Sequence, residues 1–463
     1  MPHSHTHTHT KRSHRALLAR IPPRGQSAWK LAHSHPVPSA LEDHQVLIET
    51  SYVALNPFDW QGVAFKYGIG EEAKVMGRDG AGVIVGLGDK VKRFQLGDRV
   101  WFCANSSVSG TGAFQEYSVH SDSEIGHTPD HLSCQEAATL GTGLITAGVA
   151  LFRTLGLPLE SLALPRTEEH GSKIEEGEKP WMLIWGGAGI TGVYLIELAR
   201  LLGYRVICSA SPTNHAYVRS LGADVVLDRW SDPVQLVQEI RKATNDSVRI
   251  AIDNVGGTTA NLCHQVLQGS SSWRSEHNLP STETDSTPAK LVPIAGTPKA
   301  SPDDSDAIRT VESLRISFST TFYGHPEFSE ALVDTYESLL NKKLLTPARI
   351  RLVQGGLTGI EKGLEDLRHG RVPGGYKLVA RLSDTPHLDE ALSKQGQSHE
   401  VEEAVVKVGT KRSRDQVESV QEKTQKRGRE HEEISRKRTK EERSVEHDHE
   451  AHSETPTRAV IMA

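Results

Sequence analysis

Three glycines, at positions 187, 189 and 192, have the spacing of a phosphate-binding turn. They lie in the run 181–192, WMLIWGGAGITG, between a short apolar segment and an apolar helical pattern. Glycine at these positions permits a tight strand-to-helix turn, a close approach of the backbone to a pyrophosphate, and close packing of the helix on the strand. The amides at the helix start then face an anion. The sequence therefore predicts a dinucleotide site. The turn residues expected to contact the cofactor are Gly187, Ala188, Gly189, Ile190, Thr191 and Gly192.

Residues 205–219 bear on which dinucleotide binds. An NAD site usually has Asp or Glu about 20 residues after the first glycine, where the carboxylate binds the ribose 2′-hydroxyl. The strand expected at 205–211, RVICSAS, ends without a carboxylate. The hydroxyl, amide and guanidinium groups that follow suit a 2′-phosphate, so the sequence favours NADPH. The alternative is a polar loop that only caps the next helix, with Asn214 as N-cap. The residues concerned are Ser209, Ser211, Pro212, Thr213, Asn214, Tyr217 and Arg219.

The elements that must position this turn follow from the apolar pattern. Short apolar runs alternate with helical patterns from Trp181 onward, which predicts a doubly wound parallel sheet. The expected strands are 182–186, 204–209, 224–228, 248–253 and 290–295. The polar stretch from Gly269 to Lys290 interrupts the alternation and is expected to be a surface loop.

A β-rich region precedes this α/β region. Strand patterns stand at 46–53, 83–91 and 98–102, among many Gly and Asp turn signals, and a helical pattern follows at 134–155. Residues 158–180 are rich in Pro, Glu and Lys and indicate a linker or loop. From Leu314 to Leu382 the chain returns to strand and helix patterns.

Composition restricts the class of protein. The chain has 463 residues, room for two or three domains, and a mild net charge of −6. Its four cysteines form no CxxC pair and lie in apolar stretches, which fits free thiols in a reducing compartment. No apolar run approaches the ~20 residues that span a bilayer, and the N-terminus has no secretory core. We expect a soluble, cytoplasmic protein without membrane contact.

Both ends of the chain are compositionally biased. Residues 1–15 are His-rich at the start, which favours a disordered tail over a loose metal site. Residues 384–463 are dominated by charged residues with few aromatics, which predicts a disordered or helical charged tail. The basic clusters at 411–414, 426–429 and 436–438 suggest nuclear import or nucleic-acid binding as an alternative. Interleaved Glu and Asp oppose phosphate binding, so a nucleic-acid partner is not favoured.

In combination, several motifs resemble the medium-chain dehydrogenase/reductase superfamily. They are ALNPFDWQ (54–61), MGRDGAGVIVGLGDKVKRFQLGDRVWF (76–102), GAFQEYSV (112–119), the glycine turn, and GGLTGIEKGLEDLRHGRVPGGYKLV (355–379). ALNPFDW with SPTN (211–214) looks most like fungal enoyl-reductase and quinone-reductase-like members. The resemblance implies a GroES-like β-rich catalytic domain over 16–165, completed by 315–383, and a Rossmann domain over 171–314. Superfamily members are often dimers through the cofactor domain, so a homodimer is expected.

The resemblance also bears on zinc. Zinc-dependent members use a Cys in the segment corresponding to ALNPFDW, and a His-Glu pair where this chain has Arg78-Asp79. Here the first segment has Asn56 and Pro57, and the structural-zinc lobe of four cysteines is missing. Zinc needs converging Cys, His or carboxylate ligands. We therefore expect a zinc-independent reductase.

Without a Lewis acid, an activated double bond or a quinone is the easier hydride acceptor. The expected substrate is an enone, an enoyl thioester or a quinone, with NADPH as the cofactor. The alternative is a non-enzymatic NADPH-binding relative that acts as a sensor or interaction protein. No proton donor is assigned, because water can serve.

The resemblance places the nicotinamide near 56–60 and 142–146, and adenosine contacts at 188–191, 211–214 and Arg229. Lys377 matches a family lysine close to the cofactor, with a solvated strand lysine as the alternative. Asp59 is expected to orient loop backbone or to pair with Arg78. Thr142 and Thr146 reach the substrate or cap the helix. The further cofactor residues are thus Asn56, Asp59, Arg229 and Lys377, and the expected substrate residues are Phe58, Trp60, Tyr67, Thr142 and Thr146.

Overall fold

The computed structural model describes residues 12–23, 26–66, 69, 72–162, 179–280, 287–299 and 305–387. Nearly all of them belong to one compact unit, which reaches Thr385. The His-rich start, the basic clusters of the C-terminal segment, and Tyr67 lie outside the described residues.

A six-stranded parallel sheet forms the α/β region, in the order β11-β10-β9-β12-β13-β14. Five of its strands were expected from the apolar pattern and the sixth, β14, was not. The strands are β9 (Trp181–Trp185), β10 (Arg205–Ala210), β11 (Val225–Asp228), β12 (Ile250–Asp253), β13 (Ala289–Pro293) and β14 (Val311–Ser313). The helices are α4 (Ile190–Leu201), α5 (His215–Ser220), α6 (Pro233–Thr244) and α7 (Gly257–Gln268).

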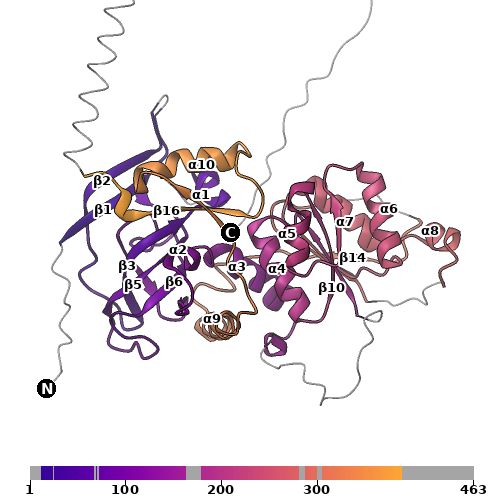
Figure 1. The fold of residues 1–463 in the computed structure, drawn as a ribbon, viewed down its shortest axis with the longest axis horizontal. Helices are drawn as coiled ribbons and strands as arrows, with labels where there is room; N and C mark the ends of the chain where they lie inside the picture. Colours follow the sequence, from indigo (N-terminus) through magenta and orange to yellow (C-terminus); the bar gives the residue numbers. More distant parts are fainter. Residues whose placement is uncertain are drawn as a thin grey trace, which may run out of the picture. The chain divides into compact units, whose positions relative to one another are not determined.

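Alternate residues of β9 explain why helices cover both faces of this sheet. Met182 and Ile184 belong to the apolar cluster that contains α4, whereas Leu183 packs with α6 and α7 on the opposite face. Figure 1 shows α4 and α5 on one side of the strands, and α6 and α7 on the other. A parallel sheet buried on both faces needs such continuous apolar strands. The Rossmann-like architecture expected from the sequence is therefore confirmed.

Two further sheets form the β-rich region. A seven-stranded sheet runs β15-β16-β3-β5-β6-β8, with β7 also paired to β3, and a three-stranded sheet runs β2-β1-β4. The larger sheet contains β3 (Gln45–Ala54), β5 (Asp79–Leu87), β6 (Arg99–Cys103), β7 (Tyr117–Ser121), β8 (Ile125–His127), β15 (Arg349–Val353) and β16 (Tyr376–Arg381). The smaller contains β1 (Ser13–Ala19), β2 (Trp29–Pro36) and β4 (Lys74–Val75). Antiparallel pairing of β16 with β3 joins the end of the fold to its beginning.

Five helices described by the structure pack around this region. They are α1 (Pro57–Ala64), α2 (Cys134–Ala137), α3 (Gly141–Gly148), α9 (Pro326–Asn341) and α10 (Ile360–Arg368). Single turns of 3-10 helix span Leu159–Leu162, Pro212–Asn214, Gly356–Gly359 and Leu382–Asp384. The helical pattern at 134–155 divides into α2, α3 and a π-helical turn at Val149–Thr154. Glycines let α3 lie close to its neighbours, since a Cβ on Gly141 would stand 2.5 Å from the Asp79 carboxylate.

The structure corrects two expectations about boundaries and loops. Strand β1 begins at Ser13, so three residues assigned to the N-terminal tail belong to the fold. The stretch from Gly269, expected to be a loop, contains the helix α8 (Ser271–Glu276) with a buried Trp273. Serine side chains explain the helix, because Ser270 caps it by accepting from the Trp273 amide at 3.0 Å.

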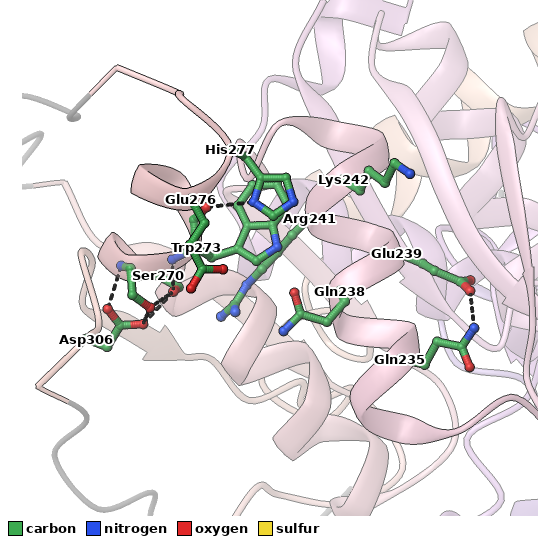
Figure 2. Close-up of a pocket in the computed structure, with 11 residues that line it drawn as sticks. Gln235, Gln238, Glu239, Arg241, Lys242, Ser270, Trp273, Glu276, His277 and Asp306 are labelled. Atoms are coloured by element: carbon green, nitrogen blue, oxygen red, sulfur yellow. Dashed lines mark hydrogen bonds between the residues drawn. The ribbon is translucent and has the colours of Figure 1, made fainter.

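Asp306 also stabilises the start of α8. It accepts hydrogen bonds from the hydroxyls of Ser270 and Ser271 and from the Ser272 amide, and these hold its pKa well below the usual range. Figure 2 shows Asp306 beside Ser270, and the Trp273 and His277 rings together. The two rings stack with centroids 4.0 Å apart. The adjoining pocket of 530 Å³ is lined by α6, α8 and Asp306, and by none of the residues expected at the cofactor or substrate.

Candidate active site

The glycine turn lies between β9 and α4, as expected. The Gly187 amide donates to Ser209 O at 2.9 Å, and Gly189 is the N-cap of α4. A Cβ on Gly192 would stand 2.5 Å from Gly186 O, so only glycine lets the helix start approach the strand end so closely. A Cβ on Gly189 would meet only Gly186 O, at 3.3 Å. The glycines therefore differ, since Gly192 serves packing and Gly189 leaves space beside the turn.

The start of α4 fits the diphosphate of a dinucleotide. The helical hydrogen-bond ladder begins with the Val193 amide, which donates to Gly189 O at 2.9 Å. The amides of residues 190–192 precede it and project from the helix end, where an anion is favoured. Ser209 supports the turn itself, because its hydroxyl accepts from the Gly186 amide at 3.0 Å.

Polar residues gather at the neighbouring strand ends. Strands β10 and β11 pair in parallel, with Ala210 beside Asp228, so the residues that follow both strands share one sheet edge. Ser211 and the turn Pro212–Asn214 follow β10, and Arg229 follows β11 with its guanidinium 4.4 Å from the Trp230 ring. Pro212, Thr213, Arg219 and Arg229 are exposed. This edge is where an adenosine group is expected in such a sheet.

The Asn214 side chain does not cap α5. Asn214 occupies the N-cap position, but no side-chain cap bond forms. Its Oδ1 instead accepts a hydrogen bond from Arg349 Nη2 at 2.7 Å. The same guanidinium lies 3.8 Å from the Tyr217 ring centroid. The expectation that Asn214 only caps the helix is therefore wrong, and its amide is tied to a strand of the other sheet.

A buried polar network joins four elements of the catalytic region. The Lys377 ammonium, on β16, lies 2.6 Å from Asp79 Oδ2 on β5 and donates to Asn56 Oδ1, next to α1, at 2.5 Å. Asp79 Oδ1 accepts from the amide and the hydroxyl of Thr142 on α3, at 2.7 and 2.5 Å. Lys377 is 2% exposed and Asp79 0%. The alternative of a solvated strand lysine is therefore wrong.

Asp59 orients backbone in the loop. Its Oδ2 accepts from the Asn56 amide at 2.8 Å, which closes the first turn of α1. Burial raises the pKa of Asp59 to about 7. Among the described contacts, Arg78 forms no ion pair with Asp59, and its guanidinium lies 3.7 Å from the Phe58 ring centroid. Of the two roles expected for Asp59, the structure therefore shows the orientation of loop backbone.

The expected substrate residues are placed in different surroundings. Thr142 sits one residue inside α3, whose N-cap is Leu140, so the Thr142 hydroxyl does not cap the helix. The Thr146 hydroxyl donates to Thr142 O at 2.6 Å. Phe58 stacks under Arg78, whereas Trp60 lies between Phe65 and Arg368 of α10, with ring and cation distances of 5.9 and 5.7 Å. Phe58 and Thr142 thus adjoin the network, and Trp60 belongs to the contact of α1 with α10.

Two residues of the network were missed by sequence reasoning. Asp79 was considered only as a replaced zinc-ligand position, although it is the partner of Lys377. Cys103, at the end of β6, lies 3.6 Å from the Thr142 hydroxyl and 3.4 Å from the Tyr323 hydroxyl. Burial, with the Asp79 charge nearby, raises the pKa of the Cys103 thiol to about 12. The apolar pattern of β5 and β6 predicted the strands, but it carried no signal for these polar contacts.

Comparison with known proteins identifies the family. The "Alcohol dehydrogenase GroES-like domain" model matches residues 42–130, and the "Zinc-binding dehydrogenase" model matches residues 191–270. A trans-enoyl reductase of Gibberella fujikuroi is 30% identical over 363 residues, which cover 76% of this chain and 95% of that protein. The trans-enoyl reductase resD of Aspergillus sclerotiorum is 31% identical over 386 residues, which cover 79% of this chain and 99% of that protein.

Solved structures share the fold. The quinone oxidoreductase of Pseudomonas syringae pv. Tomato DC3000 superposes with a TM-score of 0.58 at 18% identity, covering 79% of this chain and 99% of that one. The CurK enoyl reductase gives a TM-score of 0.57 at 18% identity, covering 80% and 99%.

The GroES-like and Rossmann regions with the glycine turn define a two-region nicotinamide oxidoreductase. The chain belongs to the medium-chain dehydrogenase/reductase family, and it is a reductase of that family. Reductases of this family bind a nicotinamide cofactor, which the amides at the start of α4 fit. In the described part of the chain, no helix is long and apolar enough to cross a bilayer.

The family description implies zinc, and the residues at the corresponding positions do not fit it. Asn56 presents an amide oxygen and Arg78 a cation, and the Asp79 carboxylate already holds the Lys377 ammonium at 2.6 Å. The nearby Cys103 thiol already contacts the Thr142 and Tyr323 hydroxyls, at 3.6 and 3.4 Å. Zinc requires thiolate, imidazole or carboxylate ligands that converge on one point. Among the described residues, His, Cys, Asp and Glu form no group of three that could hold a metal.

Proposed function

We propose that this protein is a zinc-independent, NADPH-dependent reductase of activated carbon–carbon double bonds in enones or enoyl thioesters, or of quinones. The observation that carries this proposal is the Lys377 ammonium, which lies between Asn56 and Asp79. A buried ammonium fixed beside Asn56 and Asp79 disfavours the binding of a zinc cation at the same position. The relatives named trans-enoyl reductase support the enoyl class, and the neighbour named quinone oxidoreductase supports the quinone class.

The chain's own residues would act mainly by binding and positioning. A bound reduced nicotinamide supplies a hydride. The amides of residues 190–192 hold the diphosphate, and the polar residues after β10 and β11 hold the phosphorylated adenosine. The Lys377–Asp79–Thr142 network fixes the loop around Asn56 relative to α3, the two segments expected beside the nicotinamide. Rigid placement of the two reactants supplies much of the rate in such reactions.

Buried donors would also stabilise charge that develops on the acceptor. As the β-carbon of an enoyl substrate accepts hydride, negative charge moves to the carbonyl oxygen, and a fixed donor or cation lowers that cost. The Lys377 ammonium supplies a positive charge in surroundings where it is 2% exposed. Because the Asp79 carboxylate pairs with this ammonium, the buried positive charge is held in a fixed position and is balanced by a negative one.

A substrate panel with both cofactors tests the proposal. The oxidation of NADPH and of NADH is followed by absorbance with an enone, an enoyl thioester and a quinone. We expect turnover with at least one of them, a clear preference for NADPH, and no loss of activity after dialysis against a chelator. Metal analysis of the purified protein should find far less than one zinc per chain. Activity that zinc restores, or no turnover with any substrate, would overturn the proposal.

A further inference from the structure

The Arg349 side chain connects the β-rich region with the Rossmann region. Arg349 stands at the start of β15, in the seven-stranded sheet, and its guanidinium lies beside two aromatic rings. The guanidinium carbon is 3.8 Å from the Tyr217 ring centroid and 4.4 Å from that of Tyr376. Tyr217 belongs to α5 of the Rossmann region and Tyr376 begins β16. Contact with two aromatic rings restricts the orientation of the guanidinium.

Hydrogen bonds fix the edge of the same group. Nη2 donates to Asn214 Oδ1 at 2.7 Å and to Gly374 O at 3.0 Å, and Nε donates to Gly375 O at 3.4 Å. The Gly375 amide in turn donates to Ala188 O, within the glycine turn, at 2.5 Å. Arg349 is therefore bound to the residues that follow β10 and lies close to the turn that precedes α4.

The charge of Arg349 has no carboxylate partner in the described part of the chain. All three of its hydrogen bonds go to neutral oxygens, and it forms no ion pair with a described residue. Its Nη1 group has no hydrogen-bond partner there either. A half-buried guanidinium without a counter-charge favours binding of an anion, because desolvation without a counter-charge is costly and charge-assisted hydrogen bonds are strong.

We propose that Arg349 reads the 2′-phosphate of NADPH and so determines the selectivity for the phosphorylated cofactor. The proposal rests on the NADPH preference proposed above. The phosphate would approach the polar segment Ser211–Asn214, where Nη2 holds the Asn214 amide and where Nη1 has no hydrogen bond to a described residue. A strand of the catalytic sheet would then supply the cation to a cofactor bound mainly by the Rossmann region.

Three variants test this proposal. Arg349→Met removes the charge and keeps much of the length, and Arg349→Lys keeps the charge but loses the planar group. Arg351→Met, two residues further along β15, is the matched control, since Arg351 is exposed and its one side-chain hydrogen bond to a described residue goes to Arg371 O at 3.4 Å. Dissociation constants are measured for NADPH and NADH by nucleotide fluorescence, and for adenosine 2′,5′-bisphosphate and AMP by calorimetry.

We expect Arg349→Met to weaken NADPH and the bisphosphate by about 10- to 100-fold, and NADH and AMP by less than about threefold. Arg349→Lys should keep part of the preference, and Arg351→Met all of it. An equal loss for phosphorylated and unphosphorylated ligands in both Arg349 variants would overturn the proposal and make Arg349 a structural link between the regions. Absence of any NADPH preference in the unaltered protein would instead refute the proposed cofactor. Thermal unfolding without ligand shows whether Arg349→Met is folded. If it is not, the relative affinities of Arg349→Lys for the phosphorylated and unphosphorylated ligands decide the test.

Discussion

Lys377 is buried in β16 with its ammonium against Asp79, so its removal has a large expected cost. Lys377→Met leaves the Asp79 carboxylate buried without its cation, which typically costs about 3–5 kcal/mol of unfolding free energy. Urea unfolding measures the loss. The control is Lys362→Met, because Lys362 pairs with Asp366 at 3.7 Å but is 83% exposed in its side chain. That pair should contribute no more than about 0.5 kcal/mol.

A double substitution separates the two sources of this loss of stability, the unpaired charge of Asp79 and the lost packing of Lys377. If the uncompensated carboxylate causes the loss, Asp79→Asn combined with Lys377→Met should recover part of the stability. An equal effect of Lys362→Met and Lys377→Met would contradict the buried pair described here.

Glu197, on α4, gives the protein a pH-dependent stability of the opposite sign to that of an ordinary paired acid. Burial raises its pKa to about 7. The folded state therefore holds a proton that the unfolded state has released, so stability falls as the pH rises from the ordinary carboxyl range to about 7. Glu197→Gln should remove this loss and keep the bond from the Thr346 amide, observed at 3.2 Å.

The expected gain in stability of Glu197→Gln over the unaltered protein, on the order of 1–3 kcal/mol, should appear at about pH 8 and vanish at about pH 5. Unfolding midpoints at both pH values measure it. Glu312→Gln, at an exposed position of β14, is the control and should show no such difference. A gain that is the same at both pH values would mean that Glu197 does not titrate in this way.

At the scale of elements, the glycine turn allows two roles to be separated. Gly192→Ala should lower both stability and cofactor binding, because the new Cβ would stand 2.5 Å from Gly186 O. Gly189→Ala should weaken cofactor binding with a much smaller change in stability, since its Cβ would meet only one backbone atom, at 3.3 Å. Thermal unfolding and NADPH titration of the two variants distinguish these effects. Equal loss of stability in both would contradict the difference in packing.

Local signals explain which elements could be predicted. The five strands from β9 to β13 follow from apolar runs that both helical layers require, and the glycine turn depends on spacing within a single segment. Helix α8 was missed because its N-terminal end is stabilised by a contact between Ser270 and Asp306, which are 36 residues apart in the sequence. The contacts within the polar network were not predicted, because they join residues that are distant in sequence, with Lys377 and Asn56 321 residues apart. The hydrophobic periodicity of a sequence does not predict such a contact.

At the scale of the whole molecule, the end of the fold can be located by truncation. Leu382 is 2% exposed, and the Thr385 hydroxyl accepts from the Leu357 amide at 2.9 Å. Removal of residues 382–463 should therefore cost about 2–5 kcal/mol, whereas removal of 388–463 should leave the unfolding midpoint and NADPH binding unchanged. Circular dichroism and cofactor titration compare the two chains. Loss of folding in the longer one would place essential contacts beyond residue 387.

The same truncation decides the role of the basic clusters. If the C-terminal segment binds nucleic acid, the full chain should be retained on RNA or DNA with a steep salt dependence that the chain ending at 387 lacks. We expect equal, weak retention of both, because acidic residues are interleaved with the basic ones.

If the protein is zinc-independent as proposed, the Lys377 ammonium also limits how this site could be redesigned to hold zinc. Replacing Asn56 by cysteine alone would place a thiol against an ammonium that already occupies the space. Replacing Lys377 alone would leave a buried carboxylate without a counter-charge. Each single replacement is expected to lower stability, so a redesign toward zinc would need both replacements together.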